Sequence, residues 1–260
     1  MVSDVTAHVP LMFDQQLTDW LRGLETRHLA DLRFPEVSRA LRALSSTYVE
    51  RRSRIGEGAA LSGAGKRAAF ALFYGPLHAL LVRQIALQLP AKVRRARLLV
   101  DLGCGTGASG AGWASACDPR PEVFGLDRHP WAIEEARDTY KAFGLRSRLR
   151  MDDLARAILP PNSHVLAAFA VNELSDASRD ALLPRLLAHA QAGGGVTIVE
   201  PLAGFVAPWW PTWRSAFQSV GGRADEWRVK AVLPPIVEKL DRAAGLHHRE
   251  LTGRSLTLGA

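Results

Sequence analysis

Short apolar runs alternate with helical stretches from residue 96 to about residue 200, and this alternation limits the possible folds more than any other feature. Strand-like runs occupy residues 97–101, 122–127, 148–151, 164–171 and 196–200. Between them, Pro130 opens a helical stretch that ends near Phe143, and residues 178–191 form another. Strands that alternate with helices build a parallel sheet covered by helices on both faces. The sequence therefore predicts an α/β fold.

The first 95 residues follow a helical pattern. Apolar residues recur at the spacing of one helix face in two segments: Leu17, Trp20, Leu21 and Leu24, then Val37, Leu41, Leu44 and Tyr48. We therefore expect a helical N-terminal region over residues 1–95, serving as a cap or a substrate-docking surface, and a ligand-binding domain over residues 96–260. In the tail of that domain, residues 234–244 predict a helix, and residues 248–251 with 255–258 predict a terminal hairpin.

Positive charge is concentrated in the helical N-terminal region. The chain carries 33 Lys and Arg against 26 Asp and Glu, and residues 1–95 hold 14 of the former and 8 of the latter. Arg51, Arg52 and Arg54 belong to this excess. Two interpretations stay open. The charges form a solvated helix face, or they bind the phosphates of an RNA or of a ribosomal subunit.

Several classes of protein are excluded or disfavoured by simple features. The two cysteines, Cys104 and Cys117, are too few for a disulfide scaffold or an all-cysteine zinc site, and we predict no metal site. The apolar stretch 68–89 contains Gly75, Pro76 and Arg83, so we expect buried helices and no membrane partner. The first 20 residues lack a signal-peptide pattern, and we expect a cytoplasmic protein. The oligomeric state is not predicted.

A glycine-rich loop directly after the first strand of the ligand-binding domain points to a nucleotide-like ligand. The segment reads Asp101-Leu-Gly103-Cys104-Gly105-Thr-Gly107, and a helix follows it. Glycines at such a position let the backbone turn sharply and approach a ligand closely. The spacing from Gly105 onward also fits G-x-G-x-x-G, the dinucleotide fingerprint, so the loop alone leaves two ligand classes open.

Acidic residues at successive strand ends separate these two classes. A carboxylate at Asp101 would repel a pyrophosphate and suits a cationic ligand such as S-adenosylmethionine, which has an ammonium and a sulfonium group but no phosphate. Asp127 ends the next strand, where an acid can bind ribose hydroxyls. Asp152 and Asp153 follow the third strand, where an adenine amino group could be bound. The three strand ends together predict an adenosyl site at the carboxyl edge of the sheet.

Four motifs within residues 96–200 resemble those of class I S-adenosylmethionine-dependent methyltransferases. In chain order they are DLGCGTG, GLDRHPWAIEEARDTYKAFGL, RMDDL and AAFAVNELSD. The resemblance implies a Rossmann-like sheet and a methyltransferase domain over residues 96–260. It implies that Asp101, Gly103, Gly105 and Gly107 line the methionine part, with Cys104 as a small residue in the loop. It further places Asp127 at the ribose, Asp152 and Asp153 at the adenine, and Asn172 at the transfer site. Arg128, next to Asp127, is also expected to bind the cofactor.

A second resemblance concerns the helices before the glycine loop. Two segments are similar to bacterial relatives of the mitochondrial small-ribosomal-subunit assembly methyltransferase family. They are residues 68–82, AAFALFYGPLHALLV, and the NEL sequence after the fourth strand. This similarity implies ribosomal RNA or a ribosomal subunit as partner, with Tyr74 and His78 closing over the cofactor. Glu173 of the NEL sequence is a candidate general base or a helix cap.

Three functions remain open at the level of sequence. An RNA methyltransferase, acting on ribosomal RNA, is favoured by the basic N-terminal half and by the second resemblance. A small-molecule methyltransferase would use the helices as a lid and would line its pocket with tryptophans. The alternative for these tryptophans is that they pack a cap helix; they are Trp209, Trp210, Trp213 and Trp227. A non-catalytic ribosome-assembly factor would keep the cofactor pocket without turnover.

Overall fold

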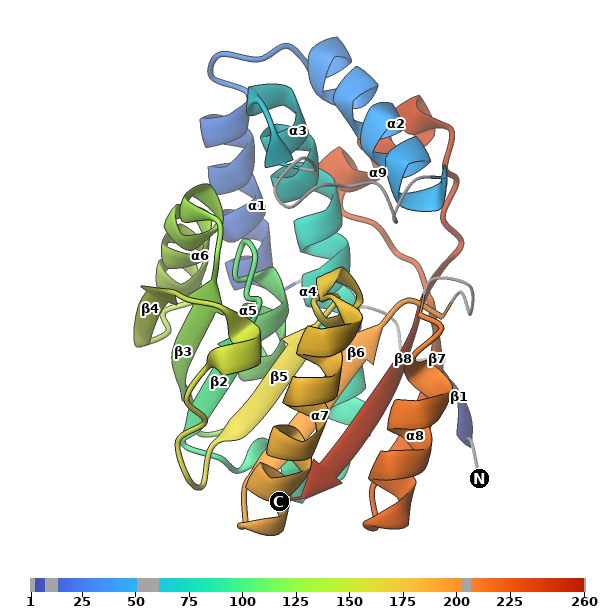
Figure 1. Ribbon diagram of the computed structural model, residues 1–260. Coiled ribbons are helices and arrows are strands. Elements are labelled where there is room, and N and C mark those ends of the chain that lie inside the picture. The colour runs from blue at the N-terminus through green and yellow to red at the C-terminus, as the bar shows by residue number, and fades with distance from the viewer. Residues whose placement is uncertain (1–2, 8–13, 51–60, 203–206, 260) are drawn as a thin grey trace.

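The computed structural model describes residues 3–7, 14–50, 61–202 and 207–259, and for residues 3–7 and 46–50 it describes the backbone only. Its centre is an eight-stranded sheet with the strand order β1-β7-β8-β6-β5-β2-β3-β4 (Figure 1). The strands are β1 (Ser3–Ala7), β2 (Leu98–Leu102), β3 (Glu122–Asp127), β4 (Ser147–Met151), β5 (His164–Ala168), β6 (Gly195–Glu200), β7 (Arg223–Lys230) and β8 (Glu250–Gly259). β8 runs antiparallel to both of its neighbours, and the other pairings are parallel.

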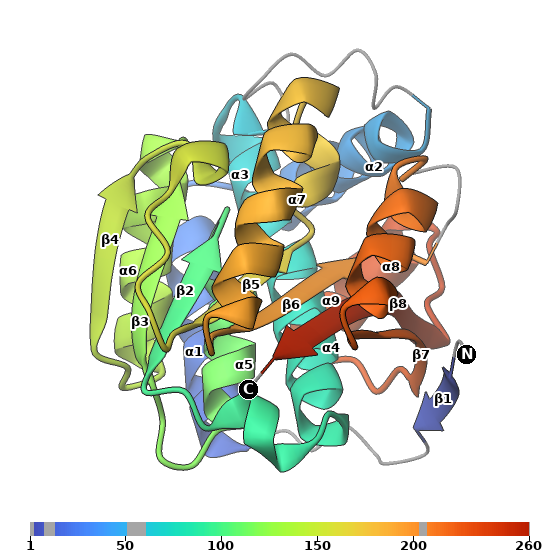
Figure 2. The same ribbon diagram turned by 60° about the horizontal axis from the view of Figure 1, so that its bottom comes forward.

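Helices cover both faces of this sheet, as the alternation predicts (Figures 1 and 2). On one face lie α4 (Gly75–Gln88), α5 (Ala108–Ser115) and α6 (Pro130–Ala142), and on the other lie α7 (Asp176–Gln191) and α8 (Trp210–Ser219). The remaining helices are α1 (Gln15–His28), α2 (Phe34–Glu50), α3 (Ala64–Ala69), the π-helical turn η3 (Phe70–Tyr74) and α9 (Pro235–Ala244). The α/β, Rossmann-like architecture predicted from the sequence is confirmed.

The two faces of the central strands build two separate cores. Along β5, Leu166 and Ala168 join the core beneath α1, α4 and α6, while Val165 and Ala167 join the core beneath α7 and α8. This alternation is the two-residue period of a strand. All five residues of β5 are buried, which explains why the segment after His164 is apolar. The helices before residue 95, namely α1, α2 and α4, share one core with α5 and α6, which follow that residue. The domain boundary at residue 95 stays a prediction.

Helix α4 packs unusually close to α5. A Cβ atom added at Gly112 of α5 would lie 2.3 Å from the backbone oxygen of Ala79, so this contact requires glycine. Ala64–Gln88 is the one described stretch with the length and hydropathy of a membrane span, yet 72% of its most apolar window is buried inside the protein. It is a core helix of this fold, as predicted from its Gly, Pro and Arg interruptions.

One strand near the C-terminus was not predicted, and the terminal hairpin predicted there is wrong. The expected terminal hairpin is a single strand, β8, which lies between β6 and a strand that the sequence analysis missed, β7. The residues between the two predicted hairpin strands, 252–254, lie inside β8, and Gly253 is one of them. A Cβ atom there would lie 3.1 Å from the Leu81 side chain, so the glycine permits close packing of α4. Helix α8 corresponds to the cap helix of one interpretation of the tryptophans, although its bounds were not predicted.

Other sequence predictions differ in smaller ways. The strand predicted over residues 164–171 ends at Ala168, because Phe169 takes a left-handed backbone conformation with φ of 59°. The N-terminal region is helical from α1 onward, but β1 precedes it and pairs with β7. Val37 and Leu41 of α2 are buried as predicted. The side chain of Tyr48, and Arg51, Arg52 and Arg54, lie outside the described residues.

A buried histidine makes the stability of this fold depend on pH. His164 of β5 stacks on Trp113 at a ring distance of 4.6 Å, and its Nε2 pairs with the Thr197 hydroxyl at 3.1 Å. Among the described residues its Nδ1 has no hydrogen-bond partner. Burial, reinforced by the positive charge of nearby His189, lowers the pKa of His164 from 6.5 to about 3. Protonation therefore favours the unfolded chain between these two values.

We predict that His164→Phe becomes more stable relative to the wild type as the pH falls from 6.5 toward 3. The wild type loses stability over this range because its unfolded state takes up a proton, whereas Phe does not titrate. The expected gain is roughly 1 kcal/mol per pH unit. Urea denaturation of both proteins across this range measures it. A stability difference that does not change with pH would contradict the assignment.

Candidate functional site

The glycine loop is held from below by a buried carboxyl group. Asp101, at the end of β2, is 1% exposed, and its Oδ2 accepts a hydrogen bond from the Tyr140 hydroxyl at 2.7 Å. A Cβ atom at Gly110 would lie 2.2 Å from the same oxygen. Burial raises the pKa of Asp101 to about 7, although the hydrogen bonds from Tyr140 and from the Gly110 backbone oppose this. Asp101 thus supports the loop from beneath, and its predicted contact with the methionine part of the ligand stays a prediction.

The glycines of the loop have different structural tasks. Gly103 and Gly107 have φ angles of 68° and 74°, and a Cβ atom at either would approach neighbouring side chains within 3.1 Å, those of Ala170 and Ala136. Gly105 also has a positive φ, 52°, but no described atom lies within 4 Å of its Cβ position. Gly105 is therefore the point at which a ligand can approach the loop, while the other two allow tight packing.

The side chains of the next two strand ends lie beside this loop, as predicted. Asp127 accepts hydrogen bonds from the backbone amides of Gly105 at 2.9 Å and His129 at 2.8 Å. A carboxylate has about four acceptor positions, so it can still bind hydroxyl groups. Arg128 follows with an exposed side chain. Cys104 is buried beneath the loop, 5% exposed, where burial raises its pKa.

Asp152 and Asp153 follow β4 at the same edge. Asp152 accepts from the amide of Asp153 at 2.8 Å and pairs with the Arg150 side chain. Asp153 accepts from the amide of Ala155 at 2.9 Å and begins a short 3-10 turn. β2, β3 and β4 are adjacent in the sheet, so the acids predicted for three strand ends are brought together. Open space at Gly105 and carboxylates along one edge fit an adenosyl ligand that carries positive charge.

On the other side of the loop, Asn172 belongs to a buried polar network. Its backbone amide and its Nδ2 both donate to the carboxylate of Glu200, at 3.1 and 2.5 Å, and its Oδ1 accepts from the Trp209 indole at 3.0 Å. Glu200 ends β6 and is fully buried. The network fixes the segment after β5 against the end of β6. Sequence analysis missed Glu200, although an acid at the end of a buried strand is a recognisable signal.

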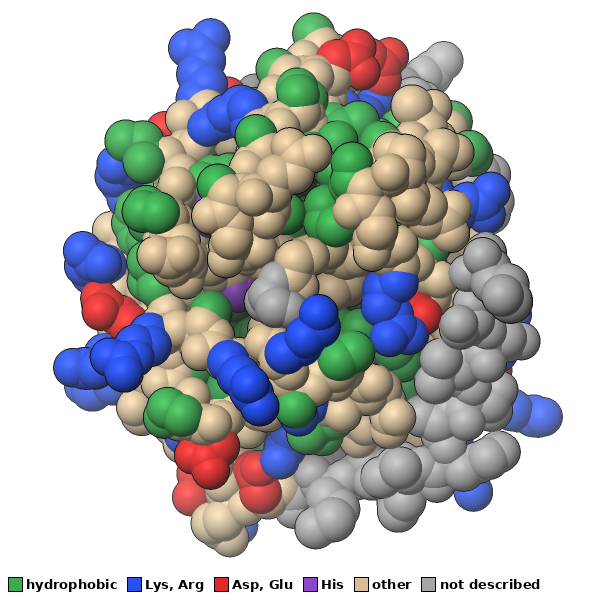
Figure 3. All heavy atoms as spheres, turned by 90° about the horizontal axis from the view of Figure 1, so that it is seen from below, with side chains coloured by type: hydrophobic (Ala, Val, Ile, Leu, Met, Phe, Trp, Pro, Cys, Tyr) green, Lys and Arg blue, Asp and Glu red, His purple; other side chains and the backbone are tan. Residues whose placement is uncertain are grey.

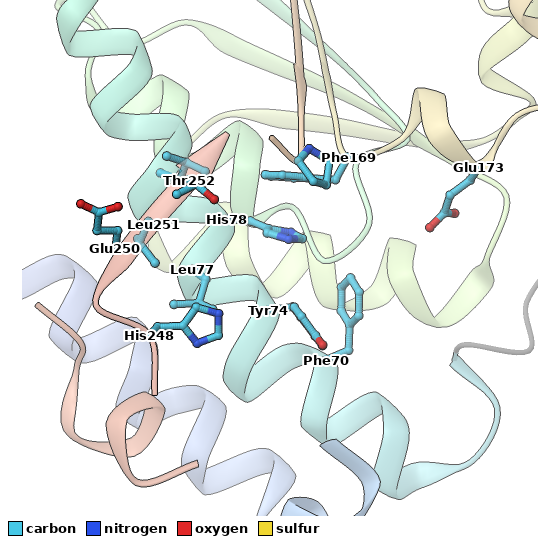
Figure 4. Close-up of a pocket in the computed structure, with 12 residues that line it drawn as sticks. Phe70, Tyr74, Leu77, His78, Phe169, Glu173, His248, Glu250, Leu251 and Thr252 are labelled. Carbon is cyan, nitrogen blue, oxygen red and sulfur yellow. The ribbon is translucent and has the colours of Figure 1, made fainter. Parts of the chain in front are cut away.

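Next to this segment lies a cavity of about 260 Å³ (Figure 4). It collects three of the candidate catalytic residues, Tyr74, His78 and Glu173, from distant parts of the sequence. The His78 ring stacks on Phe169 with their centroids 3.9 Å apart. The other lining residues are mainly apolar or belong to the start of β8: Phe70, Leu77, Leu81, Pro201, His248, Glu250, Leu251 and Thr252.

A π-helical turn explains how Tyr74 reaches this cavity. Pro76 sits in the first turn of α4 and has no backbone N–H, so the continuous helix widens before it into η3. The amide of Gly75 bonds to the backbone oxygen of Phe70 across this wide turn. Gly75 also brings the helix near the glycine loop, because a Cβ atom there would lie 3.4 Å from the Thr106 hydroxyl. The cavity therefore adjoins the loop.

The tryptophans mainly pack the protein interior, as the cap-helix interpretation expects, and do not wall a pocket. Trp210, Trp213 and Trp227 are buried in the two cores, and Trp227 donates to the Ser255 hydroxyl at 2.9 Å within the sheet. Trp209 alone reaches the site, through Asn172. Sequence analysis also missed His248, because its approach to the cavity depends on a strand that was predicted as a hairpin. The described residues contain no group of three or more metal-ligating side chains.

Comparisons with known proteins agree with this geometry. Residues 99–194 match a family model described as a methyltransferase domain. Mitomycin 7-O-methyltransferase MmcR superposes with a TM-score of 0.53 at 17% identity, over 96% of this chain and 74% of that one. An O-methyltransferase family protein from Burkholderia thailandensis gives 0.54 at 14% identity, over 92% and 70%. A putative O-methyltransferase from Nostoc punctiforme gives 0.54 at 15% identity, over 91% and 72%. No curated protein matches the sequence.

Fold, glycine loop and domain match together define the class of the protein. Residues 99–194 carry a methyltransferase domain, and S-adenosylmethionine is the methyl donor that this domain and the fold around it indicate. The roles of the individual residues in holding the cofactor remain predictions.

We predict that Asp127→Ala weakens S-adenosylmethionine binding by tenfold or more. The variant loses a charged acceptor for ribose hydroxyls and the anchor of the Gly105 amide, which corresponds to roughly 1.5–3 kcal/mol. Calorimetric titration with S-adenosylmethionine measures the change. Asp180→Ala, an exposed carboxylate on α7, is the matched control and should bind like the wild type. Equal affinity of all three proteins would refute the role of Asp127.

Proposed function

We propose that this methyltransferase acts on a small acceptor that carries an aromatic ring and occupies the cavity beside the glycine loop. The observation that carries the proposal is the cavity itself, with its volume of about 260 Å³ and its aromatic walls Phe70, Tyr74 and Phe169. Pockets of this kind, mainly apolar with a few polar groups, are typical of small-molecule sites. Aromatic side chains favour a planar ligand through stacked or edge-to-face contacts.

The position of the cavity supports transfer from a donor on the glycine loop. Phe169 and Glu173 line the cavity, and Ala170 between them packs against Gly103 of the loop. When bound, S-adenosylmethionine supplies an activated methyl group, so the protein needs mainly to align the acceptor with it. In this proposal Asp127, Asp152 and Asp153 hold the donor. Glu173 or His78 takes the proton that the acceptor releases.

Several proteins of similar fold are named O-methyltransferases, among them the mitomycin enzyme and the Burkholderia protein. At 14–17% identity these likenesses concern the fold. They are compatible with a hydroxyl group as the acceptor.

A second candidate function is methylation of RNA, in particular ribosomal RNA, with docking through basic residues. Lys92, Arg95 and Arg97 are exposed just before β2, at the amino ends of the parallel strands. Figure 3 views this side of the molecule, and Lys and Arg side chains outnumber Asp and Glu on it. Such a face can bind phosphates, with an affinity that falls steeply as salt rises.

The test is transfer of tritiated methyl from S-adenosylmethionine to three pools in parallel: a small-metabolite extract, ribosomal RNA and total protein. We expect label in the metabolite pool. Thr252→Trp should remove it by filling the cavity, because Thr252 lines the cavity from β8, whereas Thr252→Ser should retain it. Donor binding, measured by calorimetry, should be equal in both variants.

The other outcomes of this experiment decide between the alternatives. Label in RNA alone, lost at high salt, would replace the first proposal with the second. No label in any pool, with donor binding intact, would favour a non-catalytic ribosome-assembly factor.

A further inference from the structure

A histidine and a buried carboxylate meet at the end of the cavity formed by β8. Asp241 of α9 is 3% exposed, and His248 lies in the loop between α9 and β8. The Nδ1 atom of His248 hydrogen-bonds to Oδ1 of Asp241, and the backbone amide of His248 donates to Oδ2 at 2.9 Å. Both carboxylate oxygens thus bind one residue. This pair has no part in the donor site.

The loop between α9 and β8 turns back on itself to make this contact. Gly245 and His247 have φ angles of 74° and 52°, and the amide of Leu246 bonds to the backbone oxygen of Asp241 at 3.0 Å. Glycine in the left-handed region is the common end of a helix. The reversal carries His248 over the last turns of α9 and then delivers the chain into β8.

The orientation of the ring leaves one nitrogen toward the cavity. The His248 ring packs near Phe73, with ring centroids 5.8 Å apart, and its side chain is 34% exposed. It lines the cavity together with Tyr74 and His78 (Figure 4). With Nδ1 held by Asp241, no described residue hydrogen-bonds to Nε2.

We propose that His248 and Asp241 form a subsite that takes the proton of a weakly acidic hydroxyl group, such as a phenol, on the methyl acceptor. This inference rests on the proposed small-molecule function and narrows its substrate class. The O–H bond of the acceptor breaks, its proton goes to Nε2 of His248, and its electron pair stays on oxygen. The product is an oxyanion beside an imidazolium ion, which the Asp241 carboxylate stabilises.

The subsite binds the far end of the acceptor and does not touch the reacting methyl group. β8 lies three positions from β2 in the sheet, which is roughly 14 Å at about 4.8 Å per strand. The donor loop follows β2. In Figure 4, Glu173 and His248 lie on opposite sides of the cavity. An acceptor held at His248 therefore presents its other end to the segment around Phe169 and Glu173.

Asp241 acts as a positioning residue. A neutral histidine has one protonated ring nitrogen, and a carboxylate partner fixes that proton on Nδ1. Nε2 then carries the lone pair that faces the cavity. The other titratable groups around the cavity are Tyr74, His78, Glu173 and Glu250, and the nearest carboxylate behind His248 is Asp241.

The first experiment uses 4-nitrophenol as a chromogenic probe, because its phenolate is yellow and its neutral form is colourless. The full-length protein is titrated into the probe, without S-adenosylmethionine, at a pH at which the free phenol is mainly neutral. We expect the yellow phenolate to appear on binding to the wild type. His248→Gln should weaken this signal at least tenfold, since it removes the proton acceptor and the charge-assisted hydrogen bond.

The neighbouring histidine supplies a matched control. His247 is exposed and does not line the cavity, so His247→Gln should give the wild-type signal. No phenolate with the wild type, or an undiminished signal with His248→Gln, would overturn the proposal. Because the donor is absent, this result is independent of methyl transfer. A positive phenolate signal with no label in any pool would reject the proposed function and keep the proton-accepting subsite.

A second measurement tests Asp241 by a spectroscopic property that a merely structural role would not change. Nitrogen-15 NMR of the labelled histidines distinguishes the two neutral tautomers. We expect His248 to carry its proton on Nδ1 in the wild type and to populate the other tautomer substantially in Asp241→Asn. The same variant should lose the phenolate signal while remaining folded by circular dichroism. A tautomer mixture already present in the wild type would contradict the positioning role.

Discussion

The hydrogen bond between the buried Asp101 carboxyl and the Tyr140 hydroxyl fixes the position of the glycine loop, on which the donor site depends. It ties the end of β2 to α6 beneath the loop. The carboxyl also comes so close to α5 that residue 110 must be glycine. An ionised carboxylate is costly in such surroundings, and burial accordingly raises the pKa of Asp101 to about 7. The donor site thus rests on a polar contact whose geometry tolerates little change in the surrounding residues.

The carboxyl edge of the sheet divides into two regions of different chemistry. Over β2, β3 and β4 the side chains are acidic and the backbone is open at Gly105. Over β5, β6 and β8 the walls are aromatic and aliphatic, with histidines at intervals. The first region suits a cationic ligand and the second a planar apolar one. A methyltransferase needs both kinds of site side by side, because donor and acceptor differ in charge and shape.

The two regions also differ in how well the sequence predicts them. The predicted donor side comes from the ends of β2, β3 and β4, so local motifs suffice to put Asp127, Asp152 and Asp153 at one edge of the sheet. The acceptor side combines residues near positions 74, 170 and 250, which only the tertiary fold brings together. The hairpin predicted at β8 is wrong because the glycine between its two segments, Gly253, lies inside a strand and packs against Leu81, which only the tertiary fold shows. The burial of Asp101 cannot be read from a motif, because it depends on packing against α5 and α6.

Phe169 connects the two regions. Its left-handed backbone, with φ of 59°, is a conformation that bulky residues rarely adopt and that costs on the order of 1–3 kcal/mol. The surrounding contacts hold it there, because its amide donates to the backbone oxygen of Val199 at 2.8 Å and its ring stacks on His78. The next residue, Ala170, packs on Gly103 of the donor loop. One strained turn therefore contacts both the glycine loop, through Ala170, and the cavity, through the Phe169 ring.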